Sequence, residues 1–479
     1  MTNPKFKKMN RIFNPRTVAI IGATEREKSV GLGIVKNLIA NSEEFQFQAR
    51  PKNKKRDEFH YVSGKAKGVK IFFVNPFKKE VLGEQTYPKI TNIKTEIDLA
   101  IIAIPAPAVL ETVRECARKK VGGIIIITGN FGESGEEGKL MEKQIKDALK
   151  GADIPLIGPN CLGVINTANN LSASFAPLMP KKGNIAFLSQ SGAMVDAMLD
   201  RSADENFGFS KIVSYGNELD MELDEFLEYL KTDKETKIIA AYFEAIKDGP
   251  GFMHSAKEIS KRKPIVAIKA GKGAAGQKAA LTHTGALSSD YEIYKAVLKQ
   301  AGVIQVDTLD ELSDAVKALS FQPRCKNGIG IITNGGGLGV LAADFCEELE
   351  IEMPQPTDAT IKELNKQEVL KICNIRRNPL DLVGDALPER YAASLEAMLE
   401  QPDIKGILVM QAMQIMTEPL ENAKIILRIS RHFPNKPVVC CFAGGKMVEE
   451  AINLLEKNKI PNYTDPKRAV KAINSLIQR

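Results

Sequence analysis

One strand–turn–helix pattern occurs twice in the last two thirds of this chain, and it constrains the fold more than any other feature of the sequence. An apolar run with a polar, glycine-rich turn reads GNIAFLSQSGAMV at 183–195 and GIGIITNGGGLGV at 328–340. Two further apolar runs follow each copy in matching order. They span 237–246, 263–272, 405–415 and 436–446. Strands that alternate with helices are typical of parallel sheets, so we predict two similar flavodoxin-like domains, at 181–322 and 323–479.

The first third of the chain has the same alternation without the repeat. Short β-branched runs bounded by Gly, Pro or Asn predict five strands, at Thr17–Gly22, Val69–Asn75, Leu99–Pro105, Gly123–Thr128 and Pro155–Gly158. The first run is followed by glycines, as in a Rossmann crossover, but their pattern is degenerate. Gly31 and Gly33 are expected to open a helix. We predict a Rossmann-like domain over 1–180, with its ligand site at the carboxyl ends of the strands.

The two copies differ by one insertion in the first, residues 273–297. The insertion is rich in small residues, has little core periodicity before Tyr291, and carries His283 between two threonines. An insertion that adds little core and keeps a histidine is typical of a working loop, which we predict here. An ordinary loop histidine is the alternative when this segment is considered alone.

Each repeated turn is a candidate anion site. Ser189–Ala193 and Thr333–Gly337 place successive backbone N–H groups at a helix N-terminus, where the helix dipole favours phosphate. A pseudo-twofold arrangement would direct both turns at one phosphoryl group. For either turn alone, the alternative is a plain strand–helix connection.

Glu244 ends the next apolar strand of the first copy, and carboxyl ends of parallel strands meet at one edge of a sheet. We therefore expect Glu244 to reach the His283 imidazole. A neutral imidazole whose other nitrogen is hydrogen-bonded is suited to accept and release a phosphoryl group near neutral pH. A solvated glutamate at the sheet rim is the alternative.

The composition argues against several other classes of protein. The net charge of +7 has a local origin, because residues 50–70 hold eight Lys or Arg against two acids; no globally basic nucleic-acid surface is expected. No apolar run approaches the roughly 20 residues that span a bilayer. The seven cysteines show neither a CxxC pair nor metal-like spacing with the four histidines. We expect a cytoplasmic protein with free thiols, no metal site and no membrane partner.

Seven motifs together resemble a known family, in order and over essentially the whole chain. They are Ala19–Thr24, Val74–Pro76, Ile104–Ala106, Gly158–Asn166, Ser189–Ala193, Tyr242–Gly249 and Thr282–Ser288. The chain resembles the α subunit of ADP-forming acetate–CoA ligases, in the succinyl-CoA synthetase superfamily. The resemblance implies a CoA-binding Rossmann-like domain followed by two flavodoxin-like ligase domains.

The resemblance also assigns residues. His283 is expected to carry the phosphoryl group and Glu244 to hold it. The two helix N-termini that cradle the phosphohistidine correspond to Ser191, Gly192, Ala193, Gly335, Gly336 and Gly337. The residues expected at CoA are Gly22, Ala23, Thr24, Asn75, Pro76, Ile104, Pro105 and Asn160, with Lys78 or Lys79 at a CoA phosphate because Phe77 follows Pro76.

The implied reaction is reversible. Acyl-CoA and phosphate give acyl phosphate and CoA, and the phosphoryl group then passes to His283 and on to ADP or GDP. ADP or ATP and Mg²⁺ are expected to bind a separate ATP-grasp β subunit, because these 479 residues hold no counterpart of that domain. An α₂β₂ assembly is expected. The basic segment 46–68 and Ala245, where glycine is usual, depart from the family pattern.

Three alternatives remain at this stage. One is a relative with the same mechanism that is specific for succinate or an aryl acid. Another is a CoA-binding regulatory protein without catalysis, against which His283, Glu244 and both turns argue. A NAD-dependent dehydrogenase is disfavoured, because Asn75–Pro76 stands where an acidic residue is expected after the second strand.

Overall fold

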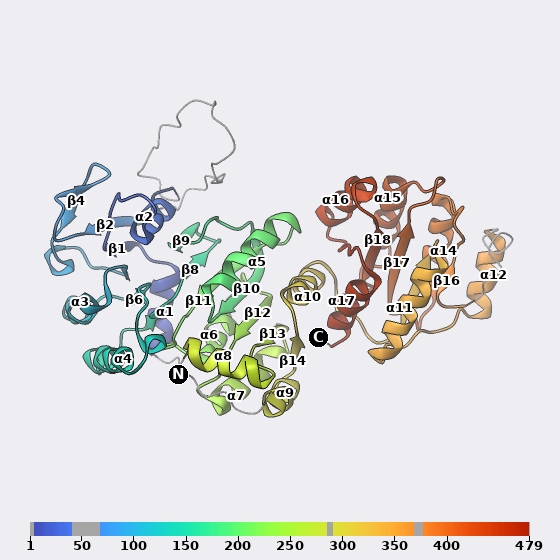
Figure 1. The fold of residues 1–479 in the computed structure, drawn as a ribbon. Coiled ribbons are helices and arrows are strands. Elements are labelled where there is room, and N and C mark those ends of the chain that lie inside the picture. Colours follow the sequence, from blue (N-terminus) through green and yellow to red (C-terminus); the bar gives the residue numbers. More distant parts are fainter. Residues whose placement is uncertain (1–3, 41–67, 285–290, 368–376, 479) are drawn as a thin grey trace. The chain divides into compact units, whose positions relative to one another are not determined.

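Two structural units make up the chain in this computed structural model, residues 1–305 and 306–479 (Figure 1). The structure describes residues 4–40, 68–284, 291–367 and 377–478. The first unit holds two sheets and the second unit holds one. The α/β architecture with parallel sheets confirms the predicted fold class.

The first sheet has the strand order β3–β4–β2–β1–β5–β6–β7 and is parallel except for the β3–β4 pair. Its strands are β1 (Thr17–Ile21), β2 (Lys70–Val74), β3 (Glu80–Val81), β4 (Glu84–Tyr87), β5 (Leu99–Ile102), β6 (Gly123–Ile126) and β7 (Leu156–Ile157). The five strands predicted for this region are confirmed, and the short strands β3 and β4 were not predicted.

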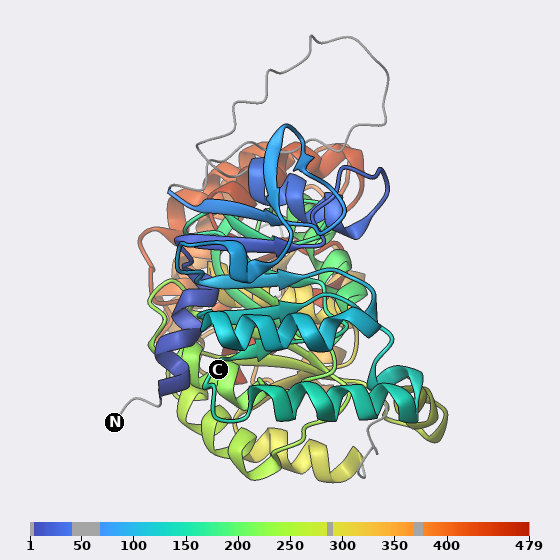
Figure 2. The same cartoon turned by 90° about the vertical axis from the view of Figure 1, so that its left-hand side faces the viewer.

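Both faces of this sheet are buried. Val18 and Ile20 pack in one core with α1 and α2, whereas Ala19 and Ile21 pack in another with α3. The helices are α1 (Pro4–Phe13), α2 (Val30–Ala40), α3 (Ala106–Lys119) and α4 (Glu136–Leu149), with short turns η1 (Ile90–Asn92) and η2 (Gly132–Ser134). Figure 2 views the unit from the side on which α3 and α4 lie. Burial of both faces explains why these strands read as continuous apolar runs.

The second sheet has the order β14–β13–β12–β10–β11–β8–β9. Its strands are β8 (Gly163–Asn166), β9 (Leu171–Ser174), β10 (Lys182–Ser189), β11 (Phe209–Ser214), β12 (Ile238–Phe243), β13 (Ile265–Lys269) and β14 (Val303–Val306). The β10–β13 strands are parallel, and the β8–β9 hairpin joins β11 antiparallel. The sequence did not predict this hairpin, because its four-residue strands carry Ser, Asn and Gly rather than an apolar run.

Five helices accompany this sheet: α5 (Gly192–Asp204), α6 (Leu223–Thr232), α7 (Gly249–Ser260), α8 (Ala274–Thr284) and α9 (Tyr291–Gln300). The predicted loop around His283 is therefore wrong as far as residue 284, because a helix occupies 274–284. Its sequence, AAGQKAALTHT, is rich in alanine, the strongest helix former, and needs no apolar stripe to be helical.

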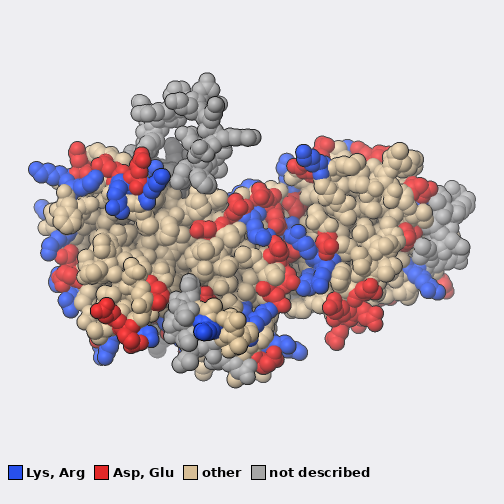
Figure 3. Space-filling model, viewed as in Figure 1, with Lys and Arg blue, Asp and Glu red and all other residues tan. Residues whose placement is uncertain are grey.

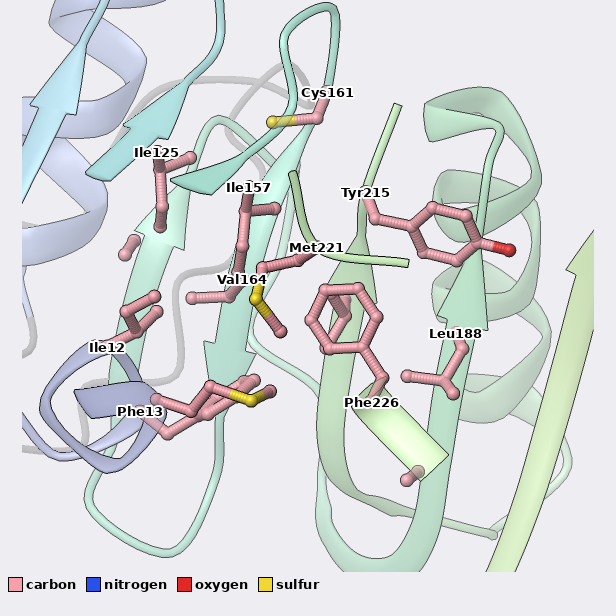
Figure 4. Packing of buried hydrophobic residues seen from close by; sticks show 14 of the residues in the cluster. Ile12, Phe13, Ile125, Ile157, Cys161, Val164, Leu188, Tyr215, Met221 and Phe226 are labelled. Atoms are coloured by element: carbon pink, nitrogen blue, oxygen red, sulfur yellow. The ribbon is translucent and has the colours of Figure 1, made fainter. Parts of the chain in front are cut away.

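One hydrophobic core joins the two sheets of the first unit (Figure 4). Ile125 and Ile157 of the first sheet lie in the same cluster as Val164 and Leu188 of the second. The ring of Tyr215 stacks on Phe226 of α6 at 5.7 Å between centroids. Because the interior is shared, the carboxyl edges of both sheets belong to one packed body.

The second unit repeats the strand order of the second sheet. Its order is β16–β15–β17–β18, which matches β11–β10–β12–β13, and all its pairs are parallel. The strands are β15 (Ile329–Thr333), β16 (Leu380–Asp381), β17 (Gly406–Ala412) and β18 (Val438–Ala443). Ser189 pairs with Tyr242 in the first copy and Thr333 with Met410 in the second, as the sequence alignment of the copies requires. The duplication is confirmed at the level of register.

The helices among the described residues of the second unit are α10 (Leu309–Phe321), α11 (Gly336–Glu348), α12 (Asp358–Lys366), α14 (Pro388–Glu400), α15 (Pro419–Ser430), α16 (Glu449–Lys457) and α17 (Pro466–Gln478), with η3 (Lys446–Val448). The helices predicted at the ends of the two copies, α10 and α17, pack against each other. The Arg468 guanidinium binds both carboxylate oxygens of Asp314, at 2.7 and 2.8 Å.

Among the described helices, none combines the length and apolar character that crossing a bilayer requires. The described cysteines are buried free thiols. Over the described residues on the face shown in Figure 3, Lys and Arg lie among Asp and Glu in each unit, so this face does not form one basic surface.

Candidate active site

A cavity of about 1240 Å³ opens at the carboxyl edge of the first sheet. Six of the nine residues predicted to contact CoA line it: Gly22, Thr24, Asn75, Pro76, Ile104 and Pro105. Arg26 and Lys89 supply cationic groups to the wall, and Phe77 supplies an aromatic ring that is 94% exposed. The cavity combines an apolar lining with a few charged groups, as pockets for large organic ligands do.

Glycine is required where β1 leads into α2. Gly22 has φ +96°, and a Cβ there would lie 2.3 Å from the Ala103 carbonyl oxygen. A Cβ on Gly31 would lie 2.6 Å from the Gly22 carbonyl oxygen. Gly31 and Gly33 lie in the first turn of α2, which begins at Val30, so these glycines open the helix as expected. The close approach directs the start of α2 at the cavity, a position that favours phosphate.

Three of the predicted CoA residues do not line the cavity. Ala23 is fully buried, and its carbonyl accepts a hydrogen bond from Asn75 Nδ2 at 2.9 Å. The Lys78 ammonium pairs with Glu25 at 2.9 Å and holds the pKa of that carboxyl below its usual value. Asn160 donates from Nδ2 to Asn217 Oδ1 at 3.3 Å.

The turn after β10 is held by its own serines. Ser189 Oγ donates to the Ser191 carbonyl at 2.7 Å and accepts from the Ser191 N–H at 3.1 Å. Ser191 Oγ accepts from the Met194 N–H and caps α5, which begins at Gly192. This is the geometry of a helix N-terminus prepared for an anion.

The turn after β15 repeats this arrangement in the second unit. Thr333 Oγ1 donates to the Gly335 carbonyl at 3.1 Å and accepts from the Gly335 N–H at 3.0 Å. A Cβ on Gly336 would lie 2.7 Å from Asp381 Oδ2, so the start of α11 tolerates only glycine without a shift. The two predicted turns thus have the same hydrogen-bonded form.

Glu244 follows β12 and is 5% exposed. The Tyr242 hydroxyl donates to Glu244 Oε1 at 3.5 Å. Lys269 lies opposite Phe243 in the neighbouring strand and is fully buried. Burial lowers the pKa of Lys269, and the negative charge of Glu244 acts in the opposite direction. The expected solvated alternative for Glu244 is therefore wrong: the carboxyl group is buried among a cation and a phenol.

His283 lies in the last turn of α8, and its side chain lies outside the described residues. The backbone of α8 contacts η2, which follows β6 of the first sheet. The helix that carries His283 is therefore next to the edge of the first sheet at which the cavity opens. A contact between the imidazole and Glu244 stays a prediction.

The sequence did not single out two buried polar residues beside Glu244, namely Gln190 and Glu218. Gln190 stands inside the predicted turn, between its two serines, and Glu218 follows a short glycine turn after β11. Burial raises the pKa of Glu218 to about 7. The sequence offered one signal for Glu218, namely a glutamate two residues after a glycine. The structure shows why this matters: Gly216 has φ +58°, and the turn that it makes fixes the position of the carboxyl group.

Three family models match the chain. A model described as CoA binding domain matches residues 16–167, one described as Succinyl-CoA ligase like flavodoxin domain matches 182–319, and one described as Ligase-CoA domain matches 329–475.

The decisive comparison is with a whole subunit. The chain is 38% identical to Acetate–CoA ligase [ADP-forming] II subunit alpha of Pyrococcus furiosus, over 98% of both chains. The chain belongs to the ADP-forming acetate–CoA ligase family. This family consists of ligases, and the predicted resemblance is confirmed.

Other relatives are longer than this chain. Acetate–CoA ligase [ADP-forming] I of Archaeoglobus fulgidus is 38% identical over 98% of this chain, which spans only 63% of that protein. Among solved structures, an acetyl-coenzyme A synthetase 1 of Ca. Korarchaeum cryptofilum, in complex with phosphate and ADP, superposes with a TM-score of 0.87. It is 30% identical, with 98% of this chain and 96% of that chain covered.

Proposed function

We propose that this chain is the CoA-binding, histidine-phosphorylated α subunit of an ADP-forming acyl-CoA ligase, with acetate as the acid. One observation carries the proposal: a single unit holds the cavity, the capped turn before α5, the buried Glu244, and the helix bearing His283. These are the parts that acyl transfer to phosphate and phosphoryl transfer to histidine require.

The reaction proceeds in three steps. Inorganic phosphate attacks the thioester carbonyl of acyl-CoA, the C–S bond breaks, and acyl phosphate and CoA form. The neutral His283 imidazole then attacks the phosphorus, and the P–O bond to the acyl group breaks to release the carboxylic acid. ADP finally takes the phosphoryl group from His283, giving ATP and restoring the imidazole.

This chain's residues have distinct roles in these steps. The cavity residues hold CoA, with Lys78 near a CoA phosphate once its pairing with Glu25 is exchanged. Glu244 accepts a hydrogen bond from the imidazole nitrogen that does not react, which keeps the other nitrogen nucleophilic. The N–H groups of the turn at Ser191–Ala193 stabilise the charge on the phosphoryl oxygens, and those at Gly335–Gly337 form a second phosphate-binding turn in the second unit.

The nucleotide is proposed to bind elsewhere. An ATP-grasp β subunit supplies the site for ADP or ATP and Mg²⁺, in an α₂β₂ assembly in the cytoplasm. The name "subunit alpha" of the Pyrococcus furiosus relative, and the extra length of the Archaeoglobus fulgidus relative, support a further chain or domain. We propose functional domains at 1–180, 181–322 and 323–479.

The test is reconstitution. The chain is mixed with the ATP-grasp subunit from its own organism, acetyl-CoA, phosphate, ADP and Mg²⁺, and ATP is measured. ATP is expected only when both subunits are present. ATP formed by the ATP-grasp subunit alone, or none with a panel of acyl-CoA thioesters, contradicts the proposal.

A further inference from the structure

The side chain of Gln190 joins two buried glutamates in the first unit. Its Oε1 accepts hydrogen bonds from the backbone N–H groups of Glu244 and Ala245, the latter at 3.3 Å. Its Nε2 donates to Glu218 Oε2 at 2.8 Å and to the Ala245 carbonyl at 3.3 Å. Gln190 is 8% exposed and Glu218 is 2% exposed, so water does not compete for these bonds.

The backbone around Glu218 is fixed independently of Gln190. Glu218 has φ +53°, and the Lys247 ammonium donates to the carbonyls of both Asn217 and Glu218. Asn217 in turn donates from Nδ2 to Glu133 and Glu142, at 2.6 and 2.8 Å. Glu133 belongs to η2, which α8 contacts. Glu218 is therefore held in place from the side of the first sheet.

The second copy has the same clamp without the second carboxylate. Asn334 occupies the position of Gln190; its Oδ1 accepts from the Ala412 N–H at 2.7 Å and its Nδ2 donates to the Ala412 carbonyl at 2.9 Å. In the second copy Asp385 corresponds to Glu218. This follows because Gly216 and Val383 occupy matching positions, each two residues earlier, and both have positive φ. Asp385 is exposed and pairs with Arg390 at 2.7 Å instead.

We propose that Gln190 and Glu218 form a positioning pair for Glu244, in which Glu218 fixes the orientation of the Gln190 amide and the amide fixes the backbone of the acid. The inference rests on the proposed phosphohistidine function. Glu218 Oε2 and the Ala245 carbonyl oxygen accept hydrogen bonds on one side of Gln190, so the amide turns its NH₂ group to them. Its oxygen then faces the N–H of Glu244, and the alternative orientation of the amide is excluded. Glutamine is one methylene longer than asparagine, which allows the reach that Asn334 lacks.

The test exchanges donor and acceptor between the two side chains. The chain, with its ATP-grasp subunit, receives acetyl-CoA and ³²P-labelled inorganic phosphate, and the rate of His283 labelling is followed. Gln190→Glu places two carboxylates against each other, and we expect labelling about tenfold slower or worse, with an unchanged KM for acetyl-CoA. In Gln190→Glu/Glu218→Gln, residue 190 accepts from both the Glu244 N–H and the new amide. We expect the double variant to return to within about threefold of wild type.

Matched variants separate positioning from general damage. Asp385→Asn changes the equivalent carboxylate of the second copy, and Gln401→Glu changes a buried glutamine of the second unit; both are expected to label at the wild-type rate per folded molecule. If Gln190→Glu does not fold, Gln190→Asn replaces it, because asparagine is too short to reach Glu218. We expect Gln190→Asn to label as slowly.

The outcomes are distinct. A double variant no faster than Gln190→Glu, or a wild-type rate in either single variant at 190, overturns the positioning pair. If wild type itself takes no label, the result contradicts the phosphohistidine function, and the positioning pair, which rests on that function, is overturned too. If wild type is labelled, the variants decide on the pair alone.

Discussion

The two copies of the strand–turn–helix pattern use the same clamp to hold different residues. In the first copy an amide after β10 binds the backbone of Glu244, and in the second an amide after β15 binds the backbone of Ala412. The hydroxyl of the preceding residue, Ser189 or Thr333, closes both turns in the same way. The hydrogen-bonded turn and its clamp are therefore kept in both copies, whereas a glutamate ends the clamped strand only in the first.

The same contrast extends to the neighbouring carboxylate. Glu218 is buried, and burial raises its pKa to about 7. Its counterpart Asp385 is exposed, and the hydrogen bond from Arg390 holds the pKa of Asp385 below its usual value. After β13 the first copy has α8, which carries His283, before α9, whereas after β18 the second copy has the short η3 directly before α16. The proposed function therefore places the chemistry on the first copy, and the second copy contributes a turn.

The largest effect on His283 labelling is expected when the carboxylate of Glu244, which the second copy lacks, is removed from the first copy. In the proposed mechanism the Glu244 charge orients the imidazole, so we expect Glu244→Gln to slow His283 labelling by about 10²- to 10⁴-fold. The matched control is Ala412→Ser, which should stay within about twofold of wild type. Equal effects of the two substitutions would contradict the assignment of chemistry to the first copy.

A smaller effect, on the free energy of unfolding, is expected to distinguish the turn after β15 from the turn after β10, because only the former leaves no room for a Cβ. In Gly336→Ala the new Cβ would lie 2.7 Å from Asp381 Oδ2, whose carboxylate is fixed by the Val383 N–H. We expect the free energy of unfolding to fall by about 1–3 kcal/mol. In Gly192→Ala the nearest atom, Leu162 Cβ, is 3.4 Å away, and alanine is the better helix former, so stability should hold or rise. Urea denaturation measures both, and a greater loss in Gly192→Ala is the contrary result.

The smallest effect is a pH dependence confined to the first copy. The pKa of Glu218 in the folded state, about 7, lies above its ordinary value of 4.5, so between these values the folded chain binds more protons than the unfolded chain. The contribution of Glu218 to stability therefore falls as pH rises from about 5 to 7. Lys247, Glu222 and the Gln190 amide act on this carboxyl group.

Glu218→Gln removes this titration. The stability of Glu218→Gln relative to wild type should rise between pH 5 and 8, whereas that of Asp385→Asn should stay level because Asp385 is ionised throughout. Thermal melting across this pH range measures both differences. A level difference for Glu218→Gln would show that its carboxyl group titrates as in the unfolded chain.

Much of the fold follows from local patterns in the sequence. Runs of β-branched residues buried on both faces gave the strands of the first sheet, and the repeated glycine-rich turn gave the positions of β10 and β15 and their helices. The β8–β9 hairpin escaped prediction because its four-residue strands mix polar residues and glycine with apolar ones, and they are buried by pairing with β11 and by packing against α2. The helix at His283 escaped because alanine gives it no apolar stripe.

The site was predicted less completely, for a physical reason. Turn residues such as Gly22 are constrained by their own backbone, and the sequence pattern shows that constraint. Gln190 and Glu218 meet only through the packing of β10 against β11 and β12, which local sequence does not encode. Lys78 is expected at a CoA phosphate, yet it pairs with Glu25, since a flexible lysine takes the nearest carboxylate.

The most direct test of the central claim locates the phosphoryl group. The chain and its ATP-grasp subunit are incubated with acetyl-CoA and ³²P-labelled phosphate, digested under alkaline conditions, and the labelled peptide is sequenced. The account predicts acid-labile label on His283 that ADP and Mg²⁺ discharge as labelled ATP. Wild-type protein without label, or label that persists in His283→Ala, would contradict it.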